Sequence, residues 1–174
     1  GSGTVVASGG GAFADQLIGK PVACAASVQK DGTWAEYMVT PASQCLPLIE
    51  GITLEQGSMI VVNPLTAYAM LDIARAAGAE GIVQTAAAGA LGQMIFRLAH
   101  SRGLKVVNIV RKDEQVELLK GIGAEVIVNS SSPKFERELL IACKKNKATI
   151  AYDAVAGPMI QTLAGCMPRG SRVV

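Results

Sequence analysis

The sequence predicts an α/β fold, a doubly wound parallel sheet, from about residue 81 onward. Five short runs rich in β-branched residues, at 82–83, 106–110, 126–128, 149–152 and 172–174, alternate with longer amphipathic segments. This alternation is typical of parallel strands joined by crossover helices. A run of small residues also separates the first strand from the first helix, where this fold needs a tight turn.

Apolar residues at helical spacing predict three helices that cover the sheet. The predicted apolar stripes are Leu91, Met94, Ile95 and Leu98, then Phe135, Leu139, Ala142 and Cys143, then Ile160, Leu163, Ala164 and Met167. A further helix is predicted over 66–77, because Gly78 directly after it is a typical helix C-cap.

The first part of the chain has a different pattern. Short strand-like runs at 4–7, 22–25 and 34–39 are separated by glycines and by a Lys-Asp-Gly turn at 30–32, which favours an antiparallel barrel. We therefore expect the tail of a barrel domain over 1–45 and the doubly wound domain over 46–174. Residues 59–62 resemble a strand by propensity alone.

Composition excludes several classes of function. The 174 residues are 50% hydrophobic and 17% charged, with a formal net charge of +2, so neither a nucleic acid nor a membrane surface is expected as partner. The longest apolar runs are far shorter than the roughly 20 residues of a membrane span. The four cysteines form no CxxC pair, which indicates neither a metal site nor a disulfide framework and favours a reducing, intracellular compartment.

The strongest site signal is the small-residue segment 84–92, which follows a strand and opens a helix. Against the GxGxxG pattern of dinucleotide-binding loops, Ala87 replaces the first glycine, and Gly89 and Gly92 hold the second and third positions. Small residues let the backbone approach a pyrophosphate, whose charge then lies on free N–H groups of the helix N-terminus. Close packing of helix on strand is the simpler alternative.

The end of the second strand indicates which dinucleotide is bound. NAD-binding folds usually have Asp or Glu here to accept hydrogen bonds from the ribose 2′-OH. This chain has Val110 followed by Arg111 and Lys112, two cations that can pair with a 2′-phosphate, so NADPH is favoured over NADH. A solvated Arg-Lys pair balanced by Asp113 and Glu114 is the alternative.

These motifs, in this order, resemble a known family over nearly all of the chain. The segments 63–68, 84–93, 108–111 and 123–125 are similar to the medium-chain dehydrogenase/reductase superfamily. They are most similar to its zinc-free branch of enoyl-thioester reductases and quinone oxidoreductases. The resemblance implies a Rossmann domain, and segment 32–37 resembles the piece by which the family's GroES-like β-barrel returns toward that domain. It also implies a helical linker, not a strand, over 59–62.

The resemblance implies a set of NADPH-binding residues and no metal ligands. Asn63 and Thr66 would lie on the nicotinamide side. The pyrophosphate would be bound by the glycine loop, Ala88, Gly89, Ala90, Leu91 and Gly92, and the 2′-phosphate by Arg111 and Lys112. A loop at the end of another strand, Ala154, Val155, Ala156 and Gly157, would approach the cofactor.

The resemblance further implies hydride transfer from NADPH to an activated double bond. The small-molecule substrate would be a 2-enoyl thioester, or a quinone or unsaturated ketone; a non-catalytic NADPH-binding or structural member of the superfamily is the alternative. No catalytic residue is assigned, because Tyr37, Tyr68 and Tyr152 do not match the family's proton-donor motif. His100 is expected to face solvent.

The resemblance also carries expectations about the whole protein. We expect this chain to be an inactive fragment, which ends inside the fifth strand, of a cytoplasmic or mitochondrial homodimer.

Overall fold

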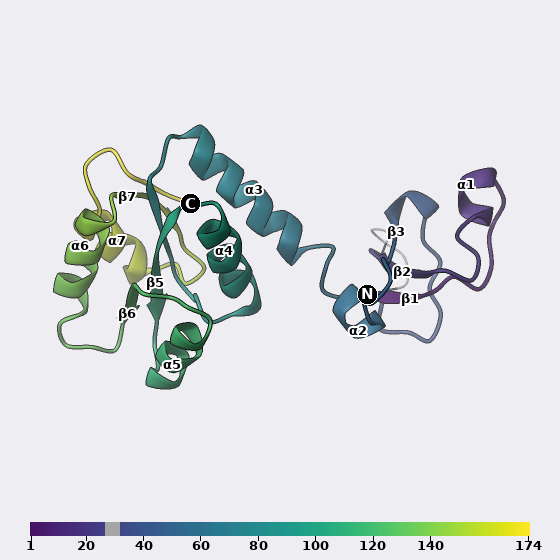
Figure 1. Cartoon of the computed structure of the whole chain (residues 1–174), viewed down its shortest axis with the longest axis horizontal. Coiled ribbons are helices and arrows are strands. Elements are labelled where there is room, and N and C mark those ends of the chain that lie inside the picture. The colour runs from purple at the N-terminus through teal and green to yellow at the C-terminus, as the bar shows by residue number, and fades with distance from the viewer. Residues whose placement is uncertain (27–31) are drawn as a thin grey trace. The chain divides into compact units, whose positions relative to one another are not determined.

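The computed structural model describes residues 1–26 and 32–174. They form two compact units, Gly1–Leu65 and Thr66–Val174, each of which is described by itself (Figure 1). The boundary predicted after residue 45, between a barrel remnant and the Rossmann domain, is a different kind of division and stays a prediction.

The first unit contains a small antiparallel sheet with strand order β1-β2-β3. Its elements are β1 (Ser2–Thr4), α1 (Ala12–Asp15), β2 (Pro21–Cys24), a 3-10 helix (Ala42–Gln44), β3 (Cys45–Pro47) and α2 (Leu54–Gly57). Gly3 pairs with Val22 across the first two strands, and Cys24 pairs with Cys45 across the next two. The antiparallel pairing agrees with the barrel-like pattern of this part of the sequence.

Three expectations for this unit need correction. The predicted strand at 34–39 is wrong: these residues form bends and irregular chain, and Trp34 is 98% exposed. Propensity alone suggested that strand, but β-structure needs a ladder partner. The strand expected at 4–7 lies earlier, at Ser2–Thr4. Residues 59–62 form turns, neither the strand that propensity suggests nor the helical linker that the resemblance implies. Residues 30 and 31 of the expected turn lie outside the described residues.

Helix α3 (Asn63–Ala76) ends as its sequence predicts. Gly78 has a φ of +67°, a left-handed conformation that glycine adopts without steric cost. Its N–H donates to the carbonyl of Arg75 at 2.9 Å, and the N–H of Ala79 donates to the carbonyl of Ala74 at 3.0 Å. These two hydrogen bonds form a Schellman cap, which satisfies carbonyls that the helix end leaves free.

The second unit is built on a five-stranded parallel sheet with strand order β6-β5-β4-β7-β8. Its further elements are β4 (Gly81–Gln84), α4 (Ala90–Ser101), β5 (Lys105–Val110), α5 (Asp113–Gly121), β6 (Ile127–Asn129), α6 (Phe135–Lys145), β7 (Ala148–Tyr152), α7 (Pro158–Cys166) and β8 (Arg172–Val173). All five predicted strands are present, so the doubly wound Rossmann fold predicted from the sequence is confirmed.

Two apolar cores cover the two faces of this sheet. Leu71 of α3, Ile95 of α4 and Leu119 of α5 pack on one face. Leu139 of α6 and Leu163 of α7 pack on the other. Figure 1 shows helices on both sides of the sheet. No helix among the described residues is both long and apolar enough to span a membrane.

The predicted apolar stripes differ in detail from the observed ones. On α4 the buried face is Gly92, Ile95, Phe96 and Ala99, each one position later than a residue of the predicted stripe, because glycine and alanine contribute by being small. The stripe on α6 is confirmed, with Leu139 and Cys143 fully buried. On α7 the prediction is partly wrong: Ile160 and Ala164 are exposed, and Cys166 is buried with Leu163 and Met167.

Candidate nucleotide-binding site

The candidate site lies at the topological switch point of the second unit. The strands that follow β4 are first added on one side of it, as β5 and β6, and then on its other side, as β7 and β8. β4 pairs with β5 on one side and with β7 on the other. The helix after β4 covers one face, whereas the helix after β7 covers the opposite face. The chain therefore diverges beyond the carboxyl ends of β4 and β7. In open α/β sheets, ligands bind in the crevice at such a switch point.

The loop between β4 and α4 is compact and closes directly into the helix. The N–H of Ala87 donates to the carbonyl of Ile109 at 3.2 Å, and the N–H of Gly89 donates to the carbonyl of Ala86 at 2.9 Å. Ala86 has a φ of +49°, which an alanine rarely adopts. Gly89 is the N-cap of α4 and provides no side-chain cap, so the first N–H groups of the helix are left for water or an anion.

Gly92 explains why the third position of the motif must be glycine. A Cβ atom on Gly92 would lie 2.5 Å from the carbonyl oxygen of Ala87 and 2.7 Å from its Cα atom. Both atoms belong to the backbone, so they cannot rotate away as a side chain could. The absent side chain lets the first turn of α4 pack directly on the loop, the role that this position has in dinucleotide-binding folds.

A buried pair of polar side chains fixes the position of this loop and of the first turn of α4. Gln84 and Asn108 are neighbours on β4 and β5, and both are almost fully buried. The Gln84 amide Nε2 donates to Asn108 Oδ1 at 2.7 Å and to the carbonyl of Gly92 at 3.0 Å. Asn108 Nδ2 in turn donates to the carbonyl of Val126 at 3.1 Å. The pair therefore links β4, β5 and the residue that precedes β6 (Ile127–Asn129) to the first turn of α4.

A second polar link joins the ends of β4 and β7. The hydroxyl of Thr85 donates to Asp153 Oδ1 at 2.8 Å and accepts from the N–H of Ala154 at 2.7 Å. The Asp153 carboxylate also accepts from the N–H groups of Val155 and Ala156, at 2.9 and 3.0 Å. Thr85 and Asp153 thus shape the loop that the sequence assigned to the cofactor.

The end of that loop has an unusual backbone. Ala156 and Gly157 both have a φ of +62°, and Pro158 then begins α7. Left-handed conformations are costly for residues with a Cβ atom, and they cluster at functional sites. The predicted residues Ala154, Val155, Ala156 and Gly157 are all exposed beside the Thr85 end of β4.

The two predicted cations lie at the end of the adjacent strand, β5. The backbone N–H groups of Arg111 and Lys112 both donate to Gln115 Oε1, at 3.0 and 3.2 Å. Ser131 donates its hydroxyl to the carbonyl of Arg111 at 2.7 Å, which connects the loop after β6. The Arg111 and Lys112 side chains are exposed and form no ion pair with other described residues.

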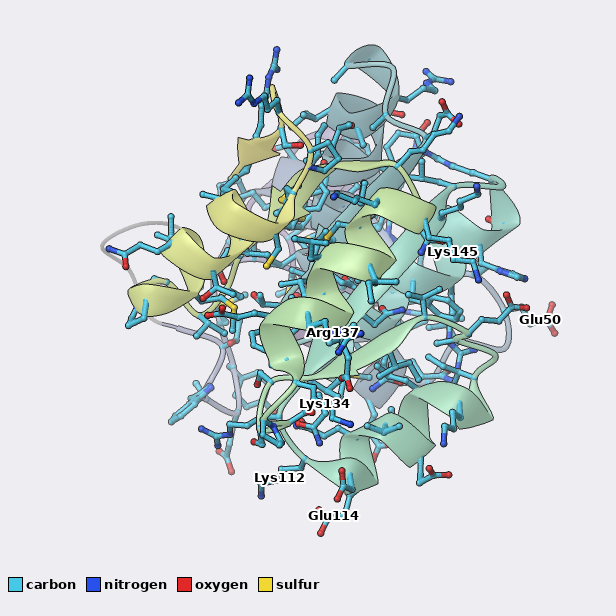
Figure 2. All side chains as sticks on the ribbon, turned by 90° about the vertical axis from the view of Figure 1, so that its left-hand side faces the viewer. Glu50, Lys112, Glu114, Lys134, Arg137 and Lys145 are labelled. Carbon is cyan, nitrogen blue, oxygen red and sulfur yellow. The ribbon has the colours of Figure 1, made fainter. Side chains whose placement is uncertain are left out.

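The sequence did not indicate a third cation at this end of the sheet. Lys134 follows the Ser131 loop and precedes α6. Figure 2 shows Lys112 and Lys134 at the same end of the unit, whereas Lys145 lies at the far end of α6. We call Arg111, Lys112 and Lys134 the basic corner. Lysine before a predicted helix is too common a pattern to identify Lys134 from sequence alone.

The remaining candidate residues are placed as follows. Asn63 and Thr66 lie in the first turn of α3, and both are half-buried. His100 is exposed on α4, as expected. Among residues 1–26 and 32–174, no group of three or more His, Cys, Asp or Glu side chains could hold a metal ion.

Two of the three tyrosines have structural partners within the second unit. The Tyr152 hydroxyl donates to the carbonyl of Met70, and burial raises the pKa of this phenol. The Tyr68 ring lies 4.5 Å from the guanidinium carbon of Arg102. These contacts account for both side chains without a catalytic role.

Comparisons with known proteins agree with this geometry. The family model described as zinc-binding dehydrogenase matches residues 90–174. A solved structure from Mesorhizobium loti, classed provisionally as an NADPH:quinone reductase, is 40% identical over 99% of this chain and 51% of its own, with a TM-score of 0.90. The chain belongs to the medium-chain dehydrogenase/reductase superfamily.

Further relatives of this superfamily member define the branch. A probable quinone oxidoreductase of Leishmania amazonensis is 30% identical over 90% of this chain and 44% of its own length. A mitochondrial enoyl-acyl-carrier-protein reductase of Arabidopsis thaliana is 27% identical over 85% of this chain and 41% of its own length. The chain therefore lies in the enoyl reductase and quinone oxidoreductase branch and spans about half the length of these relatives.

Proposed function

We propose that this superfamily member binds NADPH at the carboxyl ends of β4, β5 and β7. The uncapped N-terminus of α4 and the close approach permitted by Gly92 suit a pyrophosphate. The observation that carries the choice of NADPH is the basic corner, whose Arg111 and Lys112 side chains are exposed and without an ion pair among the described residues. The Thermus thermophilus quinone oxidoreductase, 28% identical, was solved in complex with NADPH.

The chemistry that we propose is reduction of an activated double bond by a hydride from the bound nicotinamide. The substrate class is a quinone or unsaturated ketone, or a 2-enoyl thioester. Quinone and enoyl reductases among the relatives support both. The expected homodimer and its intracellular location belong to the same proposal and rest on the family.

The chain's own residues contribute binding and orientation. In this proposal the glycine loop holds the pyrophosphate, the basic corner holds the 2′-phosphate, and the loop 154–157 borders the cofactor from β7. Asn63 and Thr66 border the nicotinamide. Thr85 and Asp153 act indirectly, because they fix the shape of the loop. We assign protonation of the reduced substrate to an acid outside these residues.

Arg111→Ala tests the choice of cofactor. A hydrogen bond to a charged group is worth about 1.5–3 kcal/mol, so the Kd for NADPH should rise about 10- to 150-fold, with little change for NADH. Titration of both cofactors by calorimetry measures the difference. Lys145→Ala, which removes an exposed cation far from the site, is the matched control. Equal weakening of NADPH and NADH would contradict a 2′-phosphate contact.

Substrate class is tested separately, by following NADPH oxidation with a benzoquinone, an unsaturated ketone and a crotonyl thioester. Turnover of one class identifies it. The assay uses the full-length protein, because this chain by itself is expected to be inactive. Tight NADPH binding by the full-length protein without turnover of any of them would instead support a non-catalytic member of the superfamily.

A further inference from the structure

The small antiparallel sheet of the first unit brings two of the four cysteines face to face. Cys24 and Cys45 are direct partners on β2 and β3, although 20 residues separate them in the sequence. Both are free thiols and half-buried. They lie on different strands and carry no role in the proposed cofactor site.

The hydrogen bonds on either side show which kind of cross-strand pair this is. The N–H of Ala25 donates to the carbonyl of Gln44 at 3.3 Å, and the N–H of Leu48 donates to the carbonyl of Pro21 at 2.9 Å. In an antiparallel ladder, bonded and non-bonded pairs alternate, so Cys24 and Cys45 form a non-hydrogen-bonded pair. The Cα atoms of such a pair are about 4.5 Å apart and their side chains are close.

That geometry falls within the range of a disulfide. Bridged cysteines have Cα atoms roughly 4.4–6.8 Å apart and Cβ atoms roughly 3.5–4.5 Å apart. The two side chains also leave the same face of the sheet, because directly opposed residues of adjacent strands do so. No change of strand register is needed to join the two sulfurs.

We propose that Cys24 and Cys45 are a redox-active pair that forms a reversible cross-strand disulfide under peroxide. The thiolate of one cysteine attacks hydrogen peroxide, which gives a sulfenic acid and hydroxide. The second thiolate then attacks that sulfur; the S–S bond forms and hydroxide leaves. In total, two thiols lose two electrons and two protons, and one peroxide is reduced to two waters. A dithiol reductant reverses the reaction.

The other two cysteines provide an internal comparison. Cys143 on α6 and Cys166 on α7 are buried, and burial together with Cys166 raises the pKa of the Cys143 thiol to about 11. At neutral pH very little of it is thiolate, the form that reacts with peroxide. Burial also raises the pKa of Cys45, so the oxidation is best run at mildly alkaline pH.

Peptide mapping of the folded chain tests the proposal without any mutation. Cleavage after Lys30 separates Cys24 from Cys45, so a disulfide between them joins two tryptic peptides and lowers their summed mass by about 2 Da, two hydrogens. After a stoichiometric dose of peroxide we expect this linked pair, a fall in free thiols from four to two, and recovery of four after dithiothreitol.

Variants then distinguish this pair from other oxidations. Cys24→Ser and Cys45→Ser should each abolish the linked peptides, whereas the control Cys143→Ser should keep them. Far-UV circular dichroism checks that each variant is folded. The proposal is overturned if folded wild-type protein keeps four thiols, if the thiols lost are Cys143 and Cys166, or if oxidation stops at sulfinic acid on Cys24 or Cys45 without a link.

Discussion

Replacement of Gly92 by alanine should destabilise the second unit, although glycine to alanine in a helix normally stabilises. The ordinary gain is about 1 kcal/mol. At Gly92 the new methyl group would meet three backbone atoms of Ala87 at 2.5–2.8 Å. Overpacking of a rigid site costs about 1–3 kcal/mol, and contacts with backbone place this site at the upper end. We therefore expect a net loss of about 1–2 kcal/mol.

Gly121→Ala is the matched control, because Gly121 ends α5 and an added Cβ would meet nothing within 4 Å. This variant should be unchanged or more stable by up to about 1 kcal/mol. Urea unfolding followed by far-UV circular dichroism reports on the helices, most of which lie in the second unit. If Gly92→Ala were as stable as Gly121→Ala, the argument from close approach of α4 to the loop would be refuted.

Three further predictions concern the polar link, a buried thiol and metal content. Thr85→Val removes the hydroxyl that bonds Asp153 and the N–H of Ala154; we expect a loss of about 1–3 kcal/mol and weaker NADPH binding, both largely restored in Thr85→Ser. The folded-state pKa of Cys143, about 11, lies above its value in the unfolded chain. The stability that Cys143 contributes should therefore be present below pH 9 and fall by about 2 kcal/mol as the pH rises through 11. Burial also raises the pKa values of Tyr152 and Cys166, so urea unfolding of Cys143→Ala against pH should show a smaller fall than the wild type. Elemental analysis should find no stoichiometric zinc; a full equivalent would contradict the assignment to a zinc-free branch.

The sequence predicts the sheet of the second unit well because its strands are buried on both faces. Runs such as 106–110 are then almost continuously apolar and β-branched, and the glycine loop has a recognisable spacing. The strand predicted at 34–39 failed for the opposite reason. β-propensity there was not matched by a ladder partner, and pairing cannot be predicted from one segment alone.

Features that depend on strand register could not be predicted from the sequence. The bond between Gln84 and Asn108 requires β4 and β5 to align at those two residues. The opposition of Cys24 and Cys45 requires the register of β2 and β3. The link between Thr85 and Asp153 is only partly foreshadowed: Asp153 directly follows the strand predicted at 149–152 and Thr85 lies two residues after the one predicted at 82–83, but the sequence alone does not show that these two strands are adjacent.

The position of β7 beside β4 has a consequence for the order in which the second unit folds. β4, β5 and β6 are joined to their neighbours by short crossovers, whereas the bond between Thr85 and Asp153 spans 68 residues. Contacts at long sequence separation bear a larger loop-closure entropy and are slow to form. The candidate nucleotide site therefore forms only when the two halves of the sheet dock. The rate at which nucleotide binding appears during refolding would report the rate of that docking step.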